Sequence, residues 1–243
     1  MLQKYFKSLY ERTMRKAYAL AVDEIIRSIG EDGRCLDCGA NEGRMYETLA
    51  KSAGLNRQRY FGIEWNSECV NDGIKKGLNI IQGDLNKPLP YDDREFRCVF
   101  GLSILEHLLN GCSYLREAYR VLEDKGSLII LTPNISTYFT IALLLLGKMP
   151  SSGPHPDSGA LLRSEEPIKV SNIQVFDVES DTPVHRHIVV FSYRVLKKYL
   201  EMVGFSEVKG YGFGLYPFPN FMQPVLENLD PYHCHQMVFI ARK

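Results

Sequence analysis

The segment CLDCGANEGRM at residues 35–45 constrains the fold of this chain most. An apolar stretch typical of a strand reaches Asp37, and Gly39 and Gly43 flank a tight turn before a helix begins. Glycine removes the side-chain wall and a helix N-terminus offers free N–H groups, so a ligand with an amino-acid carboxylate can approach closely. Asp37 can accept a hydrogen bond from the ammonium group of that ligand. The segment therefore predicts a ligand site where a strand meets a helix.

Short β-rich runs alternate with helical stretches along the chain, which is typical of a parallel sheet flanked by helices. We expect strands at about 34–38, 59–64, 79–82, 96–102, 127–131, 206–211 and 236–241. Helices are expected at about 1–30, 43–52, 68–76, 114–122 and 192–203, with Ser67 as the N-cap of the third. The sequence holds no internal repeat.

A dinucleotide-binding fingerprint is the main alternative for the glycine turn. It needs glycines at i, i+2 and i+5, whereas the chain has Asn41 and Arg44 at the latter two places counted from Gly39. A nucleotide-dependent oxidoreductase or epimerase is therefore disfavoured.

Two further acids follow the next predicted strands. Glu64 closes YFGIE, where a carboxylate can accept from both hydroxyls of a ribose, and Asp84 follows NIIQG, where it can accept from the amine of a purine. Trp65 and Leu85 would form apolar walls beside them. Acids at the carboxyl ends of successive strands predict a ligand crevice at that edge of an open α/β sheet.

Together, Asp37-x-Gly39-x-x-x-Gly43, Glu64, Gly83-Asp84 and the segment GLSILEHL resemble the class I S-adenosylmethionine-dependent methyltransferases. The group that the sequence resembles in particular is the broad small-molecule one that includes quinone-biosynthesis methyltransferases. The resemblance covers roughly residues 32–131 and, more weakly, the last helix and strands. It implies an α/β, doubly wound, Rossmann-like sheet of seven strands in the order 3-2-1-4-5-7-6, with the last strand antiparallel and a helical or loop lid inserted. It also implies S-adenosylmethionine as cofactor.

The same resemblance implies which residues bind the cofactor. The methionine end of the cofactor would be bound by Asp37, Gly39, Ala40, Asn41 and Gly43. The ribose would be bound by Glu64 with Trp65, and the adenine by Gly83, Asp84 and Leu85. Leu102 and Ser103 would lie beneath the sulphonium. The chain departs from the family at Ala40-Asn41, where Cys-Gly is commoner, but Asn tolerates a left-handed backbone.

Residues for the methyl acceptor are expected in two places. Glu106 and His107 follow the fourth strand, where His107 could deprotonate an acceptor or could only order the loop. The second half resembles a subset often associated with methionine metabolism, cell-surface polysaccharides or lipid-linked pathways, and this supports an acceptor pocket within 134–191. Asn134, Tyr138 and His187 are its candidate substrate-binding residues.

A metal site is not expected from the sequence. His185 and His187 alternate, as do His233 and His235, but no matching Cys or acid pair stands at metal-ligand spacing. Cys35 and Cys38 imitate a redox pair. Because they lie three apart on a buried strand, their side chains should face opposite sides of the sheet, which favours a structural role.

The chain is expected to form one domain over residues 1–243. Its parts are an N-terminal helix at 1–30, the cofactor-binding half at 31–133, the lid at 134–191 and a C-terminal helix with strands at 192–243. We expect no long regular element over 150–187, which is rich in proline, and a long aromatic loop at 212–234.

Two segments bear on membrane contact. The N-terminal helix is cationic and amphipathic, which favours packing on the domain but also allows peripheral membrane contact. Its predicted buried stripe is Leu2, Phe6, Leu9, Met14, Tyr18, Val22, Ile25 and Ile29. The apolar run at 141–146 is too short to cross a membrane and indicates a buried or lid-forming helix.

Composition limits the classes of partner and the cellular compartment that we expect for this protein. Lys and Arg number 29, as do Asp and Glu, so the formal net charge is zero and nucleic acid is not an expected partner. Six irregularly spaced cysteines in 243 residues favour a reducing, cytoplasmic setting. We expect a monomer or homodimer that transfers a methyl group to an O, N or C nucleophile of a small-molecule or lipid-like acceptor by direct displacement. The alternative is a non-catalytic S-adenosylmethionine-binding regulatory or partner subunit.

Overall fold

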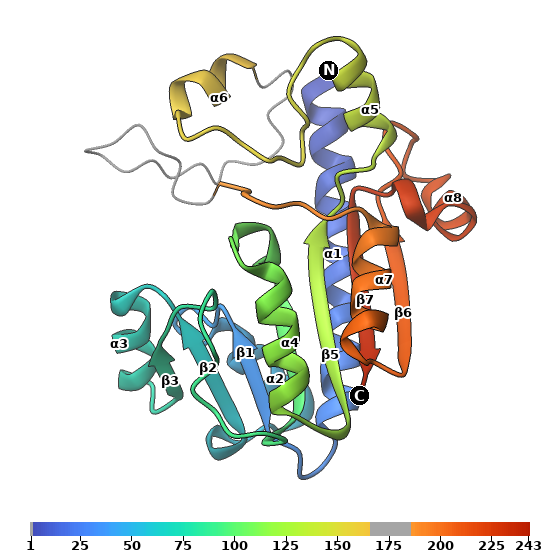
Figure 1. Cartoon of the computed structure of the whole chain (residues 1–243). Coiled ribbons are helices and arrows are strands. Elements are labelled where there is room, and N and C mark those ends of the chain that lie inside the picture. Colours follow the sequence, from blue (N-terminus) through green and yellow to red (C-terminus); the bar gives the residue numbers. More distant parts are fainter. Residues whose placement is uncertain (1, 166–185) are drawn as a thin grey trace.

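The computed structural model describes residues 2–165 and 186–243. Its centre is one sheet of seven strands in the order β3-β2-β1-β4-β5-β7-β6 (Figure 1). The strands are β1 Cys35–Cys38, β2 Tyr60–Glu64, β3 Asn79–Gln82, β4 Phe96–Leu102, β5 Leu122–Pro133, β6 Glu207–Phe213 and β7 Gln236–Arg242. β1 to β5 pair in parallel, and β7 runs antiparallel to both β5 and β6. The predicted fold, strand order and antiparallel last strand are confirmed.

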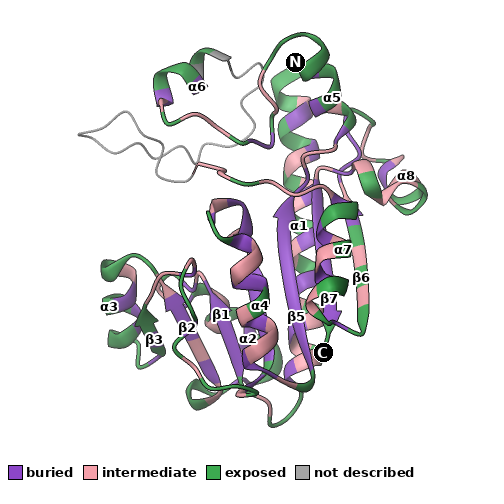
Figure 2. Ribbon diagram, viewed as in Figure 1, coloured by how far each residue is buried: buried purple, intermediate pink, exposed green. Residues whose placement is uncertain are grey.

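Helices cover both faces of this sheet, so the central strands are buried on both sides (Figure 2). The helices are α1 Leu2–Ile29, α2 Arg44–Ala53, α3 Ser67–Lys75, α4 Gly111–Val121, α5 Tyr138–Leu145, α6 Gly159–Glu165, α7 Tyr193–Val203 and α8 Gln223–Leu229. Short 3-10 turns lie at η1 Arg57–Arg59, η2 Leu105–His107 and η3 Pro231–His233. Apolar side chains of α1, α2 and α3 share one core, and those of α4 and α7 share the other. Cys35 belongs to the first core and Cys38 to the second, as their spacing predicts.

Helix α1 joins the sheet to a group of elements beyond the strand ends, which consists of α5 and α8 with the loops beside them and is called the cap below (Figure 1). With 28 residues it is about 42 Å long, and its C-terminal half packs on the sheet through Ala17, Ala21 and Ile25. Its N-terminal half extends past the strand ends toward α5 and α8 (Figure 1), where Phe6 packs on Phe139 and Tyr216. Helix α1 is therefore a wall shared by the cofactor half and the cap.

The buried face of α1 matches the predicted stripe toward both ends of the helix, at Phe6, Leu9, Ile25 and Ile29, and differs from it elsewhere. Thr13, Ala17 and Ala21 are buried where Met14, Tyr18 and Val22 were expected, and Leu2 is 62% exposed. Small residues on the buried face let the helix backbone approach the sheet closely. Hydrophobicity alone therefore selected the wrong stripe in the middle of this helix.

Other boundaries shift for local reasons. Asn66, and not Ser67, caps α3, because its side chain accepts from the backbone N–H groups of Glu68 and Cys69. Strand β5 begins at Leu122, five residues earlier than predicted, and pairs there with Phe96.

Helical turns occur in both segments that were predicted to be irregular. Helix α6 lies within 150–187 and α8 lies within the predicted aromatic loop. Pro224 supplies a first-turn residue for α8, and the buried Gln223 side chain ties the helix to the backbone of Leu215 and Phe218.

The apolar run in α5 is only partly buried. Leu143 is buried, whereas Leu144, Leu145 and Leu146 are more than half exposed. Across the described ranges, each helix is too short or too polar to pass through a membrane.

Candidate active site

The turn between β1 and α2 is held in a shape that glycine permits. Gly39 and Gly43 have φ of 87° and 88°, and a Cβ at either position would collide with Ile104 or Leu78 respectively. The N–H groups of Gly39 and Ala40 both donate to the carbonyl of Ile63, at 2.8 and 3.1 Å. The turn is therefore fastened to the end of β2.

Glu64 at the end of β2 is held by the same turn. One carboxylate oxygen accepts from the backbone N–H of Asn41 and the other from that of Asn66, both at 2.9 Å. Asn41 is left-handed with φ of 49°, as its place in the turn requires. Trp65 beside it is 71% exposed. The carboxylate is thus oriented before any ligand arrives.

Asp37 is buried at the end of β1. The hydroxyl of Tyr60 donates to its carboxylate at 2.5 Å. Burial raises the pKa of Asp37 to about 7, with Tyr60 lowering it and Glu64 raising it. A cationic group brought against Asp37 would stabilise its charged form.

Asp84 follows β3 at the same edge of the sheet. Its side chain accepts from the backbone N–H and the amide of Asn86, while Leu85 is buried beside it. The N–H of Gly83 donates to the carbonyl of Glu64 at 3.0 Å. Because β1, β2 and β3 pair in parallel, Asp37, Glu64 and Asp84 share one edge, as the sequence predicts.

Glu106 and His107 lie in η2, directly after β4. The connection passes through Leu102 and through Ser103, whose φ is 57°. Glu106 is buried, accepts from the hydroxyl of Thr132 at 2.9 Å, and has its pKa raised to about 7 by burial. His107 Nδ1 lies 2.9 Å from the carbonyl of Arg186, and its Nε2 lies 4.0 Å from Glu106 Oε1.

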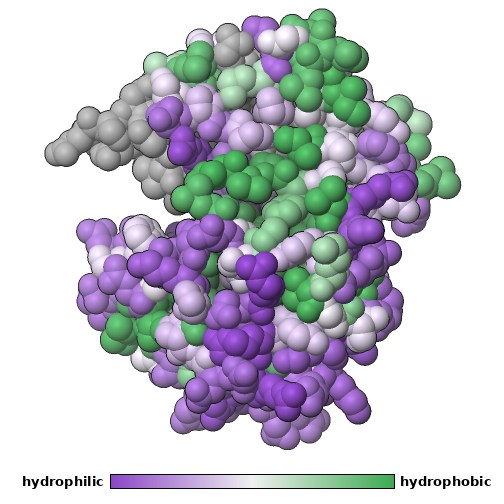
Figure 3. Space-filling model, viewed as in Figure 1, coloured by the Kyte–Doolittle hydropathy of each residue, from purple (hydrophilic) through white to green (hydrophobic). Residues whose placement is uncertain are grey.

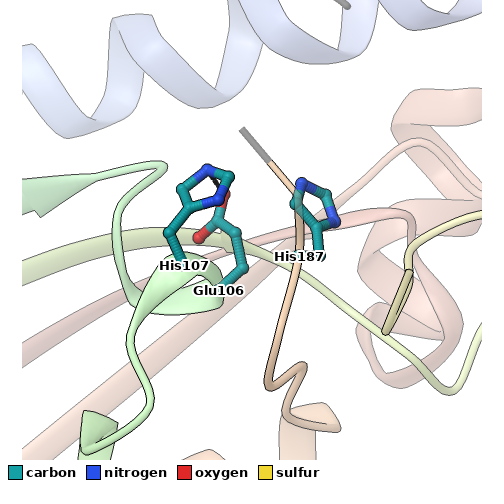
Figure 4. Close-up of side chains that lie close together, drawn as sticks. All are labelled: Glu106, His107 and His187. Atoms are coloured by element: carbon teal, nitrogen blue, oxygen red, sulfur yellow. Dashed lines mark ion pairs between the residues drawn. The ribbon is translucent and has the colours of Figure 1, made fainter. Parts of the chain in front are cut away.

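His187 lies across from this pair on the segment that leads to α7 (Figure 4). Its ring centroid is 5.2 Å from that of His107 and 5.0 Å from that of His155, on which it stacks. Its Nδ1 is 2.5 Å from the carbonyl of Ser152. Burial lowers the pKa of His187 to about 4, so the imidazole is neutral near pH 7.

Several residues at this end were not predicted for the site. The hydroxyl of Tyr18 lies near Ser103, and Tyr10 packs edge-on against His235 with ring centroids 6.2 Å apart. The spacing of eight between the two tyrosines places them on one face of α1, which is the signal that could have found them. Thr132 and His155 carried no such signal, because their partners are far away in the sequence.

Asn134 and Tyr138 have their polar groups engaged elsewhere. The buried amide of Asn134 donates to the carbonyls of Tyr232 and Cys234 at 2.8 and 2.9 Å. Tyr138 donates to Asp230 at 2.6 Å, and its ring stacks on His233. Of the three predicted acceptor residues, the structure thus brings His187 beside Glu106 and His107, and ties the other two to the loop before β7. His185 lies outside the described residues.

One comparison with known proteins identifies a family. The family profile described as a methyltransferase domain matches residues 10–209. No curated relative matches the sequence.

Solved structures share the fold at low identity. A Haloferax volcanii methyltransferase in complex with the Trm112 methyltransferase activator is 13% identical, with a TM-score of 0.59 over 97% of this chain and 92% of its own. A SAM-dependent methyltransferase from Thermotoga maritima is 15% identical, with a TM-score of 0.55 over 100% of both chains. The [4+2]-cyclase SpnF is 14% identical, with a TM-score of 0.55 over 91% of this chain and 80% of its own.

Proposed function

The chain belongs to the methyltransferase-domain family, with S-adenosylmethionine as cofactor, and we propose that it methylates a small-molecule or lipid-like acceptor. The attacking atom would be an O, N or C nucleophile of that acceptor, and the transfer a direct displacement. One observation carries the proposal. An oriented acidic edge at the ends of β1, β2 and β3 stands beside a buried cluster of titratable side chains after β4.

The acidic edge fits the cofactor. Asp37 and the turn from Gly39 to Gly43 suit a methionine ammonium and carboxylate, because Gly39 and Gly43 present backbone without a side chain and the turn leads into the N-terminus of α2. Glu64 suits the ribose hydroxyls, and Asp84 with Leu85 suits the adenine. When bound, the cofactor supplies an electrophilic methyl group on sulphur.

The buried cluster suits an acceptor next to that methyl group. Glu106 and His107 follow β4 directly, so they stand at the same edge as the acids. A carbonyl only accepts, so His107 donates through Nδ1 to Arg186 and keeps its lone pair on Nε2. That nitrogen can hold or deprotonate a hydroxyl or amine of the acceptor, or act through an ion bound there.

An amphipathic acceptor is favoured by the surface around the cap. Figure 3 shows hydrophobic residues gathered over α5 and a hydrophobic band across the middle of the molecule, where it is hollowed. Ile141, Leu144, Leu145 and Leu146 contribute exposed apolar side chains on and just after α5. A lipid-like molecule could lie along such a surface with its polar end toward Glu106.

Calorimetric titration with S-adenosylhomocysteine tests the cofactor half. We expect saturable binding that Asp37→Ala and Glu64→Ala each weaken about tenfold or more, since each removes a charged hydrogen-bonding partner. Asp72→Ala is the matched control, because Asp72 is an exposed acid on the outer side of α3 that pairs with Lys75. Well-folded protein that fails to bind the ligand would overturn the proposal.

A second assay separates an enzyme from a partner subunit. The similarity to a methyltransferase solved with the activator Trm112 and to a cyclase shows that this fold serves several roles. Labelled methyl donor incubated with a metabolite extract should yield a labelled product with the wild-type chain. Tight cofactor binding without a product would favour the non-catalytic alternative.

A further inference from the structure

Glu106, His107 and His187 each direct one potential ligand atom to a common point. These three atoms all lie within 4.8 Å of one another (Figure 4). Across residues 2–165 and 186–243, this is the one group of three or more His, Cys, Asp or Glu side chains that could hold a metal ion. The residues come from two segments 80 positions apart, which explains why spacing along the sequence did not reveal them.

Hydrogen bonds set the tautomer of both histidines. His107 Nδ1 faces the carbonyl of Arg186 and His187 Nδ1 faces the carbonyl of Ser152, at 2.9 and 2.5 Å. A carbonyl oxygen has no proton to give, so both Nδ1 atoms carry the hydrogen and both lone pairs lie on Nε2. Metal-binding histidines are oriented in the same way, through a donor bond from the other ring nitrogen.

The surrounding backbone holds the three side chains in place. One carboxylate oxygen of Glu106 accepts a hydrogen bond from the hydroxyl of Thr132. The backbone carbonyl of Glu106 accepts from the N–H groups of Ile188 and Val189 at 2.7 and 3.3 Å. This fastens the segment that carries His187 to η2. On its other side His187 stacks on His155. The cluster is therefore assembled before any ion binds.

We propose that Glu106, His107 and His187 form a binding site for a divalent transition-metal ion. Two imidazoles and one carboxylate are the ligand set of catalytic zinc and of non-haem iron(II), and they leave further positions open. Ligand atoms around such an ion at about 2.1 Å stand roughly 3.4 Å apart, so small side-chain rotations close the site.

The acceptor would bind at the open positions. An oxygen of the acceptor bound there would be oriented, and its hydroxyl proton would become more acidic and leave to water. This role rests on the proposed methyl transfer. Ion binding does not, so a failure of one is distinguishable from a failure of the other.

Direct titration with metal tests the site without any turnover. Full-length protein, freed of metal by dialysis against a chelator, is titrated with Zn²⁺ in a calorimeter and with Co²⁺ under visible absorption. We expect saturation at one ion per chain and Co²⁺ bands typical of nitrogen and oxygen ligands. Mg²⁺ should compete poorly, since it prefers an all-oxygen shell.

Variants assign the ligands. Glu106→Gln, His107→Ala and His187→Ala should each weaken Zn²⁺ binding at least about tenfold, and the two histidine changes combined should abolish it. His233→Ala is the matched control and should bind the ion unchanged, because His233 pairs with Asp230 outside the cluster. Thermal melting and S-adenosylhomocysteine binding show that each variant folds. The proposal is overturned if the wild type shows no saturable binding, or if binding persists in the double histidine variant.

Discussion

The two ends of the site are built in different ways. At the cofactor end, short turns after β1, β2 and β3 supply the polar groups, and neighbouring backbone N–H groups hold them, as Asn41 and Asn66 hold Glu64. At the acceptor end, side chains from α1, η2, β5 and the segment before α7 meet across long stretches of sequence. The first end is built from the turns that follow adjacent parallel strands, and the second from the packing of elements that lie far apart in the sequence.

This difference has an energetic side. A turn with satisfied backbone keeps its shape whatever ligand it holds, whereas buried carboxylates and imidazoles keep theirs only while the packing around them persists. Substitutions at the cofactor end should therefore change binding and local strain. Substitutions at the acceptor end should change stability or turnover with little effect on cofactor affinity.

The largest effect is expected for Gly39→Ala. Its φ of 87° is strained for any side chain and its Cβ would collide with Ile104, so we expect a loss of about 2–3 kcal/mol in the free energy of unfolding together with weaker S-adenosylhomocysteine binding. Denaturant melts and calorimetry measure both.

Gly54→Ala is the control for this change. Gly54 also has a positive φ, of 64°, but a Cβ there meets nothing within 4 Å. It should cost about 1 kcal/mol and leave binding intact. Equal effects of the two substitutions would show that the turn after β1 has no special shape requirement.

The next effect belongs to the acceptor end. Asn134→Ala removes the donor to the carbonyls of Tyr232 and Cys234, the second of them buried, and should lower the free energy of unfolding by about 2 kcal/mol with unchanged cofactor affinity. Asn228→Ala deletes an exposed hydrogen bond that the side-chain amide donates to the carbonyl of Pro224, and should cost under about 0.5 kcal/mol. If Asn134→Ala instead melts like the wild type and loses turnover, Asn134 is a substrate residue, as the sequence predicts.

The same difference between the two ends explains which features of the fold and the site could be predicted from the sequence alone. The strand order, the edge that carries Asp37, Glu64 and Asp84, and the glycine turn follow from contiguous segments, so periodicity and resemblance find them. Partners such as Thr132 and Glu106, 26 residues apart, depend on the register of β4 against β5. No local pattern encodes that pairing.

The inner face of α1 was hidden for a different reason. The buried positions in the middle of the helix are Thr13, Ala17 and Ala21, which carry little hydrophobic signal, while the half-buried Tyr18 lies near Ser103. A stripe chosen for large side chains includes Tyr18 and Val22, whereas close packing on the sheet buries the small Ala17 and Ala21 completely.

Cofactor binding should depend on pH through Asp37. Its pKa of about 7 reflects burial, with Tyr60 lowering and Glu64 raising it, so the carboxylate that attracts the ligand ammonium is lost as pH falls below 7. Affinity for S-adenosylhomocysteine should therefore rise from pH 6 to pH 8, by up to about tenfold per unit below the pKa. Calorimetry across this range measures the slope.

The stability of the free protein should depend on pH in the opposite direction to the cofactor affinity. The folded pKa of Asp37 lies above the ordinary value of about 3.9, so its contribution to stability is full below that value and is lost as pH rises through 7. In Asp37→Asn the affinity should become flat with pH, and the difference in melting between this variant and the wild type isolates the second trend. A wild-type affinity that is flat from pH 6 to 8 would contradict the assignment of Asp37 to the ammonium.

The smallest effect is expected where the two ends touch. Tyr18 on α1 lies near Ser103 in the connection between β4 and η2, so Tyr18→Phe removes a hydroxyl that interacts with Ser103 and should cost about 1 kcal/mol, a roughly fivefold change in cofactor affinity or turnover. Tyr5→Phe removes a hydroxyl from the same helix, one that donates to Pro217 near the surface, and should change neither quantity. If Tyr18→Phe lowers turnover alone, α1 belongs to the acceptor end; if it lowers cofactor affinity, α1 serves both ends and the division between them is not complete.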